Sequence, residues 1–291
     1  MSEIFSVPSP ALSPEADDML ASLRDYRRRF TAAADAYDAS TERASDLEMV
    51  MADYSTYVTD ERNVAPFAEL SRTMPGDTAA LVADLRAQSA RCAAVMEKYR
   101  ALRLLEGRAG SVGYFANVES CIEEEFGAVG PTRDSRVLLV GSGSFPMTLL
   151  NVAARTGAAT AGVDIDPEAV ALGRRVVELL GSDLSSDLGG DLDIALEDLP
   201  AEELRFTPGA THIVISSTVE TKYDILHRLH AVTRDDVVVA MRFGDGLKSL
   251  FNYPMRDVDR DRWRLVETIR RPDQVFDIAL YAKQSPDRED G

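Results

Sequence analysis

The order of hydrophobic and polar residues divides the chain into two parts with different periodicity. In the N-terminal third, apolar residues recur at three- and four-residue steps within segments rich in Ala, Leu, Arg and Glu, which is typical of amphipathic helices. The clearest helix is expected over 77–106, with Asp77 as its N-cap and Gly107 as its stop signal. Earlier helices are expected over 14–39 and 42–58, so this part is predicted to form a helical bundle. The apolar stripe of the 77–106 segment consists of Leu81, Leu85, Cys92, Val95, Met96 and Tyr99.

After Pro131 the pattern changes to short apolar runs that alternate with helical segments. Strands are expected over residues 135–140, 160–165, 211–217, 235–241, 262–268 and 275–282, with a weaker strand over 191–197. Such alternation predicts a parallel sheet covered by helices on both faces. The fold class is therefore α/β, with a Rossmann-like sheet domain over 130–291 and an N-terminal α-helical bundle domain over 1–129.

Composition narrows the classes of function. The chain has 32 Lys and Arg against 49 Asp and Glu, and its net charge of −17 argues against binding nucleic acid or an anionic membrane. No apolar run reaches the roughly 18 residues needed to span a bilayer, and the start lacks the blocks of a signal peptide, so we expect a cytoplasmic protein. Two cysteines and three histidines supply too few ligands for a zinc site or a disulfide framework, and no metal is expected.

Chemistry is expected in the loops at the carboxyl ends of the strands. In "VLLVGSGSFPMTLL", Gly141 and Gly143 flank Ser142 and allow the backbone to turn sharply and approach a ligand closely, while the helix that starts near Pro146 offers free N–H groups. The next strand ends at Asp164 and Ile165, about twenty residues further on, where an acid can accept both ribose hydroxyls of a nucleoside. A tight turn with a surface carboxylate is the alternative interpretation.

The glycine loop also favours one nucleoside ligand over another. It lacks the three-glycine pattern that brings a helix against a pyrophosphate, which favours S-adenosylmethionine over a dinucleotide. Asp198 follows the next strand, where its carboxylate could accept a hydrogen bond from the adenine amino group. It could equally be an acid at a helix N-terminus.

Several segments resemble the nicotianamine synthase family in order and spacing. They are "RVLLVGSGSFPMTLL", "GVDIDPEAV", "ETKYDILHRLHAVTRDDVVVAMRFGDGLKSLFNYP" and "RRPDQVFDIALYAK", preceded by "GYFANVESCIEEEFG". The resemblance covers residues from about 90 to 283. It implies a class I methyltransferase sheet that binds S-adenosylmethionine and transfers its 3-amino-3-carboxypropyl arm to an amine or phenol in a small-molecule acceptor, with release of 5'-methylthioadenosine. The acceptor is the expected partner, and the possibility of a homodimer is left open.

The resemblance also implies roles for particular side chains. Arg242 would hold the carboxylate of the amino-acid arm, because a guanidinium offers two parallel donors in a fixed fork. Glu97 and Tyr114 are the candidate catalytic residues. Glu97, in the "MEKY" segment, would act as general base or bind the ammonium of the arm. The candidates for binding the acceptor are Phe115, Asn117 and Tyr253.

Departures from the family leave the acceptor and the reaction open. Where the relatives carry Arg-Ser-Ala-His-Gly, this chain has the sequence from Arg242 to Gly246, Arg-Phe-Gly-Asp-Gly, which favours a single transfer to a different acceptor in metallophore or specialised-metabolite synthesis. The alternatives are a small-molecule methyltransferase, a cyclase that forms azetidine-2-carboxylate, and a subunit that binds S-adenosylmethionine without catalysis.

Overall fold

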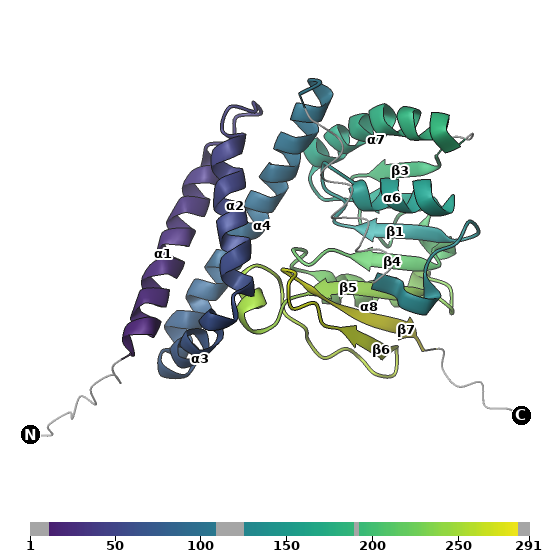
Figure 1. Ribbon diagram of the computed structural model, residues 1–291. Coiled ribbons are helices and arrows are strands. Elements are labelled where there is room, and N and C mark those ends of the chain that lie inside the picture. The colour runs from purple at the N-terminus through teal and green to yellow at the C-terminus, as the bar shows by residue number, and fades with distance from the viewer. Residues whose placement is uncertain (1–11, 109–124, 189–191, 285–291) are drawn as a thin grey trace, which may run out of the picture.

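The protein consists of a layer of helices packed beside a seven-stranded sheet that carries further helices (Figure 1). The computed structural model describes residues 12–108, 125–188 and 192–284. The helical layer comes from the N-terminal part of the chain and the sheet from the rest, in the expected order. The domain boundary at residues 129 and 130 stays a prediction.

The helical layer begins and ends where capping chemistry allows it. Its helices are α1 (Pro14–Asp35), α2 (Ala44–Thr59), α3 (Val64–Thr73) and α4 (Pro75–Leu105), with the 3-10 turn η1 (Glu61–Asn63) between α2 and α3. The prediction that Asp77 is an N-cap is wrong, because Pro75 opens α4 and places Asp77 in its first turn. Gly107, with φ of 70°, adopts the left-handed conformation just after α4, so the predicted stop is confirmed.

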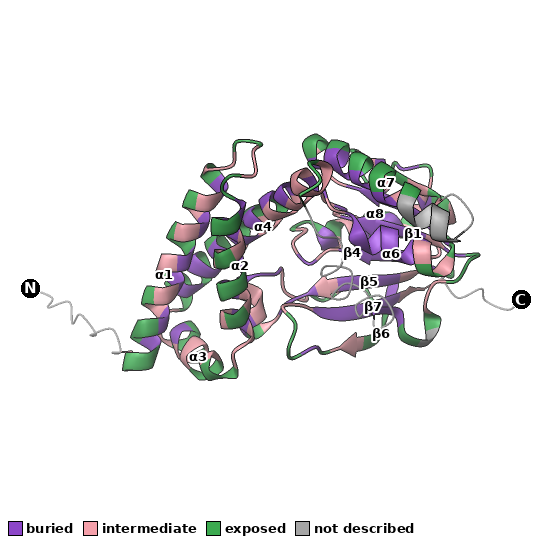
Figure 2. Ribbon diagram, turned by 45° about the horizontal axis from the view of Figure 1, so that its top comes forward, coloured by how far each residue is buried: buried purple, intermediate pink, exposed green. Residues whose placement is uncertain are grey.

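Helix α4 is the central element of the bundle and also its contact with the sheet. It packs against α1, α2 and α3 on one side and against α7 (Pro167–Leu188) on the other. Its predicted apolar stripe is confirmed: Leu81, Leu85, Cys92, Val95 and Tyr99 are buried in the bundle core, and Met96 packs against them. Figure 2 shows the buried residues of the bundle on the inner faces of the helices, with exposed residues outside.

Every strand end lies within three residues of the predicted end. They are β1 (Arg136–Val140), β2 (Ala159–Val163), β3 (Ile194–Glu197), β4 (His212–Ile215), β5 (Val238–Phe243), β6 (Trp263–Ile269) and β7 (Asp277–Lys283). Their order in the sheet is β3-β2-β1-β4-β5-β7-β6. Strand order therefore reverses beside β1, and β1 and β4 open a crevice at their carboxyl ends, where this class of sheet binds ligands.

Helices cover both faces of the sheet, as predicted. Along β1, Leu138 and Val140 contact the core beneath α8 (Lys222–Val232), whereas Leu139 contacts the core beneath α6 (Met147–Thr156) and α7. The alternation follows from the two-residue period of a strand, which sends neighbouring side chains to opposite faces.

The sheet is mixed, which differs from the parallel sheet predicted from the alternating pattern. Strands β1 to β5 are parallel, but β7 runs antiparallel to both β5 and β6. The connection from β3 to β4 contains the 3-10 turn η3 (Thr207–Gly209) in place of an α-helix. Strand direction depends on how the connection crosses the sheet, and the local pattern of apolar residues does not encode it.

The segment after β5 inserts into the helical bundle. It contains the 3-10 turn η4 (Gly246–Leu250), and Leu247, Leu250 and Phe251 are all part of the bundle core. The Phe251 ring stacks on Tyr54 of α2 with ring centroids 5.9 Å apart, and the Tyr54 hydroxyl donates a hydrogen bond of 2.9 Å to the Leu250 carbonyl oxygen. The two layers therefore share one apolar core at this segment.

Among the described helices, none is long and apolar enough to cross a bilayer.

Replacing Tyr54 with Phe tests the contact between the bundle and η4. The change leaves the ring packing intact but leaves the buried Leu250 carbonyl without its donor, which should lower the free energy of unfolding by about 1–3 kcal/mol in urea titrations. Tyr99→Phe is the matched control, because the buried Tyr99 hydroxyl has no hydrogen-bond partner among the described residues. An equal loss of stability in the two variants would contradict the assigned role of the Tyr54 hydroxyl.

Candidate active site

A cavity of about 750 Å³ lies between α4 and the carboxyl ends of the parallel strands. The segments after β1, β2, β3 and β4 form its floor and sides, and Ala90, Ala93, Ala94 and Glu97 of α4 close it from the bundle side. Its lining includes six acidic residues, Glu97, Asp164, Asp166, Asp198, Glu202 and Glu220, against one basic residue, Arg228. The cavity is therefore suited to a cationic occupant.

The glycine loop after β1 turns sharply, as its sequence predicts, and lies close to two protein side chains. Gly141 and Gly143 have φ of 78° and 63°, in the region that favours glycine. A β-carbon on Gly141 would lie 2.8 Å from Cγ2 of Val219, and a β-carbon on Gly143 would overlap the Glu97 carboxylate. Between them, the Ser142 side chain is buried and its hydroxyl has no hydrogen-bond partner among the described residues.

The acid that ends β2 lies directly beside the glycine loop. The Asp164 carboxylate accepts a hydrogen bond of 2.9 Å from the Gly143 N–H and one of 3.0 Å from the Asp166 N–H. Ile165 is 96% exposed, which is unusual for a large apolar side chain, and it lines the cavity together with Asp198. Asp164, Ile165 and Asp198 thus come together at one cavity, as the sequence predicted, although their binding roles stay predictions.

Glu97 reaches from α4 into this cavity and contacts the glycine loop. Burial raises the pKa of its carboxyl to about 8, and the nearby Asp164 carboxylate adds to the shift. Three weaker interactions lower the pKa of Glu97: the charge of Arg100, a hydrogen bond from the Ser144 N–H and the charge of Arg242. The pKa of Glu97 is therefore raised into the range that suits a general base.

Lys98, the next residue along α4, fixes this orientation of the helix. Its ammonium forms ion pairs with Asp166, at 2.7 Å, and with Glu168 at the start of α7. Asp166 also accepts hydrogen bonds from the N–H groups of Glu168 and Ala169, so it caps α7. Burial opposes the charge on Lys98, but its two acidic partners outweigh burial and raise its pKa. Because adjacent helical residues point about 100° apart, this attachment directs Glu97 toward the glycine loop.

Arg242 lies at the end of β5 and is held by a residue that the sequence analysis did not consider. Its guanidinium forms an ion pair of 2.7 Å with the fully buried Glu125 and contacts the Thr148 hydroxyl at 3.5 Å. It also lies over the Phe276 ring at 5.1 Å. Arg242 is close enough to Glu97 to lower its pKa, but it is not part of the cavity lining. Its role as a carboxylate clamp stays a prediction.

Tyr253 lines the cavity, as expected for a substrate-binding residue. The sequence analysis did not identify its two neighbours, Arg86 and Glu220. Arg86 of α4 lies over the Tyr253 ring at 5.2 Å and donates a hydrogen bond of 2.8 Å to the Ser249 carbonyl oxygen. Burial raises the pKa of the Tyr253 hydroxyl, and the neighbouring Glu220 carboxylate raises it further. The phenol therefore stays protonated and can donate a hydrogen bond.

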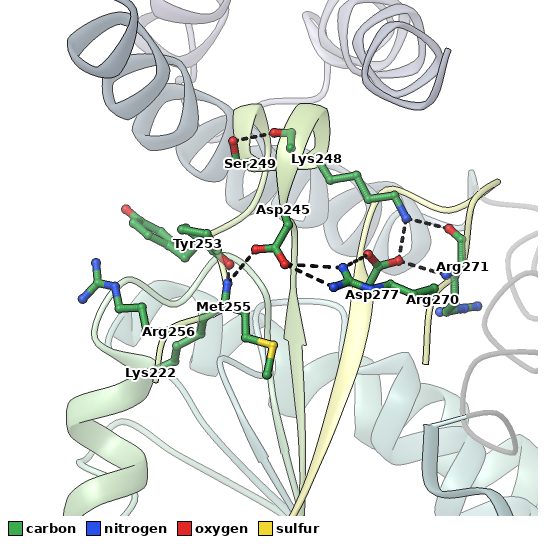
Figure 3. A network of polar contacts seen from close by, with 12 residues as sticks. Lys222, Asp245, Lys248, Ser249, Tyr253, Met255, Arg256, Arg270, Arg271 and Asp277 are labelled. Atoms are coloured by element: carbon green, nitrogen blue, oxygen red, sulfur yellow. Dashed lines mark hydrogen bonds and ion pairs between the residues drawn. The ribbon is translucent and has the colours of Figure 1, made fainter. Parts of the chain in front are cut away.

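A polar network holds the segment between β5 and Tyr253 in place (Figure 3). Asp245 accepts a hydrogen bond of 3.0 Å from the Met255 N–H, and Arg270 connects Asp245 to Asp277. Burial opposes ionisation of Asp277, but hydrogen bonds from Lys248, Arg271 and Arg270 outweigh it and hold its pKa below the usual range.

The fully buried Lys222 completes this support from α8. Its ammonium donates hydrogen bonds of 2.6 Å to the Tyr253 carbonyl oxygen and 3.0 Å to that of Arg242. Burial lowers its pKa to about 7. Both ends of the segment are thus tied to the first residue of α8, which explains how a loop can hold Tyr253 at the cavity wall.

The remaining predicted residues, Tyr114, Phe115 and Asn117, lie outside the described residues. Within the described part of the chain, no cluster of three or more His, Cys, Asp or Glu side chains is arranged to hold a metal ion. Two of the residues that the sequence analysis missed have a local signal, since Asp166 and Glu168 form a capping pattern in "DIDPEAV". The sequence around Arg86, Glu125 and Lys222 does not indicate their partners.

Comparison with proteins of known sequence finds relatives that share the same name. The chain is 34% identical over 176 residues to the L-histidine 2-aminobutanoyltransferase of Pseudomonas aeruginosa, a match that covers 60% of this chain and 63% of the relative. It is 33% identical over 170 residues to the protein of the same name from Yersinia pestis, which covers 58% of this chain and 60% of that protein. The chain thus spans somewhat less than two thirds of the relatives' length. No protein-family model matches it.

Comparison with solved structures covers nearly the whole chain. The crystal structure of MtNAS in complex with MTA and tNA matches with a TM-score of 0.70 at 15% identity, over 92% of this chain and 98% of that one. A glutamate-to-glutamine mutant of MtNAS in complex with S-adenosylmethionine matches with a TM-score of 0.67 at 15% identity, over 90% of this chain and 98% of that one. At such low identity the likeness establishes the fold.

The chain has a class I methyltransferase-like α/β fold with an N-terminal helical layer. Within that class, the named relatives and the nicotianamine synthase structures together confirm the predicted resemblance to the nicotianamine synthase-like family.

The pKa of Glu97 makes a prediction about stability. Between pH 4.5, the ordinary pKa of a glutamate, and about 8, the folded protein keeps a proton that the unfolded chain loses, so folding stability contributed by this site falls as pH rises through that window. Glu97→Gln removes the titration. The variant should therefore gain stability relative to wild type as pH increases from below to above the window, as measured by urea unfolding.

Glu178→Gln is the matched control, because Glu178 is exposed on α7 and does not line the cavity. Its stability difference from wild type should show no such rise. A Glu97→Gln difference that is the same at both ends of the window would show that the carboxyl is ionised normally.

Proposed function

We propose that the protein transfers the 3-amino-3-carboxypropyl group of S-adenosylmethionine to a small-molecule nucleophile, with release of 5'-methylthioadenosine. The observation that carries the proposal is the Glu97 carboxyl, which lies against Gly143 in the cavity and has a pKa of about 8. An amine acceptor must lose a proton as it attacks the donor, and the Glu97 carboxyl is placed to take that proton. The name of the relatives, L-histidine 2-aminobutanoyltransferase, agrees with this reaction.

The described residues fit S-adenosylmethionine as the donor. A cavity of about 750 Å³ is within the range of about 300–1,000 Å³ that is usual for small-molecule sites. The turn at Gly141 and Gly143 leaves no β-carbon to obstruct a close ligand, and the buried Ser142 hydroxyl has no partner of its own. Asp164 retains lone pairs for ribose hydroxyls, and Ile165 offers an apolar surface to a base.

The charge of the lining favours an amine over an acidic acceptor. Six acidic residues and one basic residue line the cavity, and the basic one, Arg228, forms an ion pair with Glu202. The donor carries a sulfonium and an ammonium, so an acidic lining stabilises it, and the same lining attracts a second cation. Amino acids such as L-histidine are therefore the first acceptors to test, ahead of phenols.

The proposed role of Glu97 is to take the proton of the acceptor. The sulfonium of the bound donor makes the γ-carbon of its arm electrophilic, and the sulfur leaves with the bonding electrons. As the amine lone pair bonds to that carbon, its proton passes to the Glu97 carboxylate. Tyr253 would orient the acceptor through its hydroxyl, and Lys98 holds α4 so that Glu97 keeps its place. The product belongs to specialised-metabolite synthesis, as the resemblance to nicotianamine synthases implied.

The direct test is to identify the coproduct. The protein is incubated with S-adenosylmethionine and each of several acceptors, including L-histidine, other amino acids and phenols, and the mixtures are separated by chromatography. The expected result is 5'-methylthioadenosine in proportion to a 3-amino-3-carboxypropyl adduct of one amine. S-adenosylhomocysteine as the sole coproduct would support the methyltransferase alternative and refute the proposal. Free azetidine-2-carboxylate, formed without any acceptor, would point to a cyclase.

Glu97→Gln should lower kcat by about 100-fold or more if the side chain is the base, because positioned general bases contribute roughly 10²–10⁴. The amide preserves the shape of the side chain, so binding of 5'-methylthioadenosine, measured by calorimetry, should change little. Glu178→Gln should leave both quantities unchanged. If Glu97→Gln keeps the wild-type kcat, then another group accepts the proton.

A further inference from the structure

The main cavity extends beyond the residues that are proposed to bind the donor. The glycine loop, Asp164 and Asp198 follow β1, β2 and β3. The rest of the lining includes the segment after β4, the helices α4 and α8, and Tyr253. An acceptor that binds beside the donor therefore has to lie against these remaining elements.

The segment after β4 is fixed between the glycine loop and Tyr253. The Ser216 hydroxyl, at its start, donates a hydrogen bond of 2.9 Å to the Gly141 carbonyl oxygen. The Tyr253 N–H donates one of 3.0 Å to the Ser217 carbonyl oxygen. Glu220, further along the same segment, is exposed and lines the cavity. The segment thus presents a carboxylate to the part of the cavity that is left for the acceptor.

The Tyr253 hydroxyl lies near this carboxylate. Glu220 is close enough to raise the pKa of the phenol, and both side chains line the cavity. Arg86 lies over the Tyr253 ring, but its Nε–H donates to the Ser249 carbonyl oxygen, and Glu220 forms no ion pair with any described residue. In Figure 3 the Tyr253 ring points away from the network of Asp245. The pair offers a ligand an anionic acceptor and a phenol that can donate or accept.

The bundle side of the cavity carries a second carboxyl on an apolar surface. Ala90, Ala93 and Ala94 of α4 line it together with Glu97. The alanine side chains have no hydrogen-bonding group, so they suit an apolar stem or the face of a ring. An acceptor in this part of the cavity therefore meets one carboxyl on α4 and another on the segment after β4.

We propose, as an extension of the proposed transfer, that Glu220 selects acceptors that carry a second basic nitrogen. While the reacting amine lies at Glu97, an N–H of the second group donates to the Glu220 carboxylate beside Tyr253. An imidazole or a second ammonium can make this hydrogen bond. A hydrocarbon side chain cannot, and it would desolvate the carboxylate without replacing its water. Glu220 contacts the substrate and takes no part in the proton transfer, so it determines specificity.

A binding experiment separates this selectivity from the transfer. The full-length protein is saturated with 5'-methylthioadenosine, which has no arm to transfer, and is titrated by calorimetry with two matched pairs of probes. L-histidine is compared with β-(2-thienyl)-L-alanine, and L-ornithine with L-norvaline; the second member of each pair lacks the basic nitrogen. We expect at least one basic probe to bind about fivefold or more tightly than its neutral partner. A protein that shows this preference but forms no 5'-methylthioadenosine from S-adenosylmethionine would refute the transfer and leave the selectivity intact.

Variants assign the preference to Glu220. Glu220→Gln keeps the shape of the side chain and removes its charge, so it should raise Kd for the basic probe by about fivefold or more and leave Kd for the neutral partner unchanged. In the transfer assay it should raise KM for the basic acceptor more than it lowers kcat, the opposite of Glu97→Gln.

Asp224→Asn is the matched control, because Asp224 is an exposed acid in the first turn of α8 that does not line the cavity. It should leave Kd for both members of each pair unchanged. The proposal is overturned if neither basic probe binds wild type more tightly than its neutral partner, or if Glu220→Gln and Asp224→Asn behave alike.

Discussion

The attachment of α4 to the sheet is the constraint on which the rest of the site depends. Lys98 is held by the capping acid of α7, and the neighbouring residue on the same helical turn is Glu97, whose carboxyl meets the glycine loop. One ion-pair cluster therefore sets the rotation of a 31-residue helix about its axis. The cluster therefore places the Glu97 carboxyl at the glycine loop.

The second connection between the helical layer and the sheet is apolar. It contributes stability, whereas the ion pairs of Lys98 contribute orientation. The segment after β5 places Leu250 and Phe251 in the bundle core, so burial of apolar surface binds the layers together with little directional preference. The hydrogen bonds of Lys222, Asp245 and Tyr54 then choose one geometry among those that burial would permit. Tyr253 reaches the cavity only because both kinds of interaction act on a segment of about ten residues.

Most of the fold could be predicted from the sequence, but the partners across the site could not. Strand positions follow from apolar runs bounded by Gly and Asp, and Gly141, Asp164 and Asp198 are found together because parallel strands end at one edge. The antiparallel direction of β7 and the start of α4 at Pro75 were missed, since neither leaves a distinct local pattern. Arg242 illustrates the limit: its partner Glu125 is 117 residues away, and only the folded chain brings them together.

Gly143 has a consequence for how such a site can change during evolution. The space that a β-carbon would occupy is filled by the carboxylate of a residue from the other layer, so the loop acts as a receptor for that side chain as well as for a ligand. Substitutions at positions 143 and 97 are therefore expected to be coupled. A homologue with a larger residue at position 143 could not keep a glutamate in this orientation at position 97. A homologue without the glutamate at position 97 would not need glycine at position 143 for this reason.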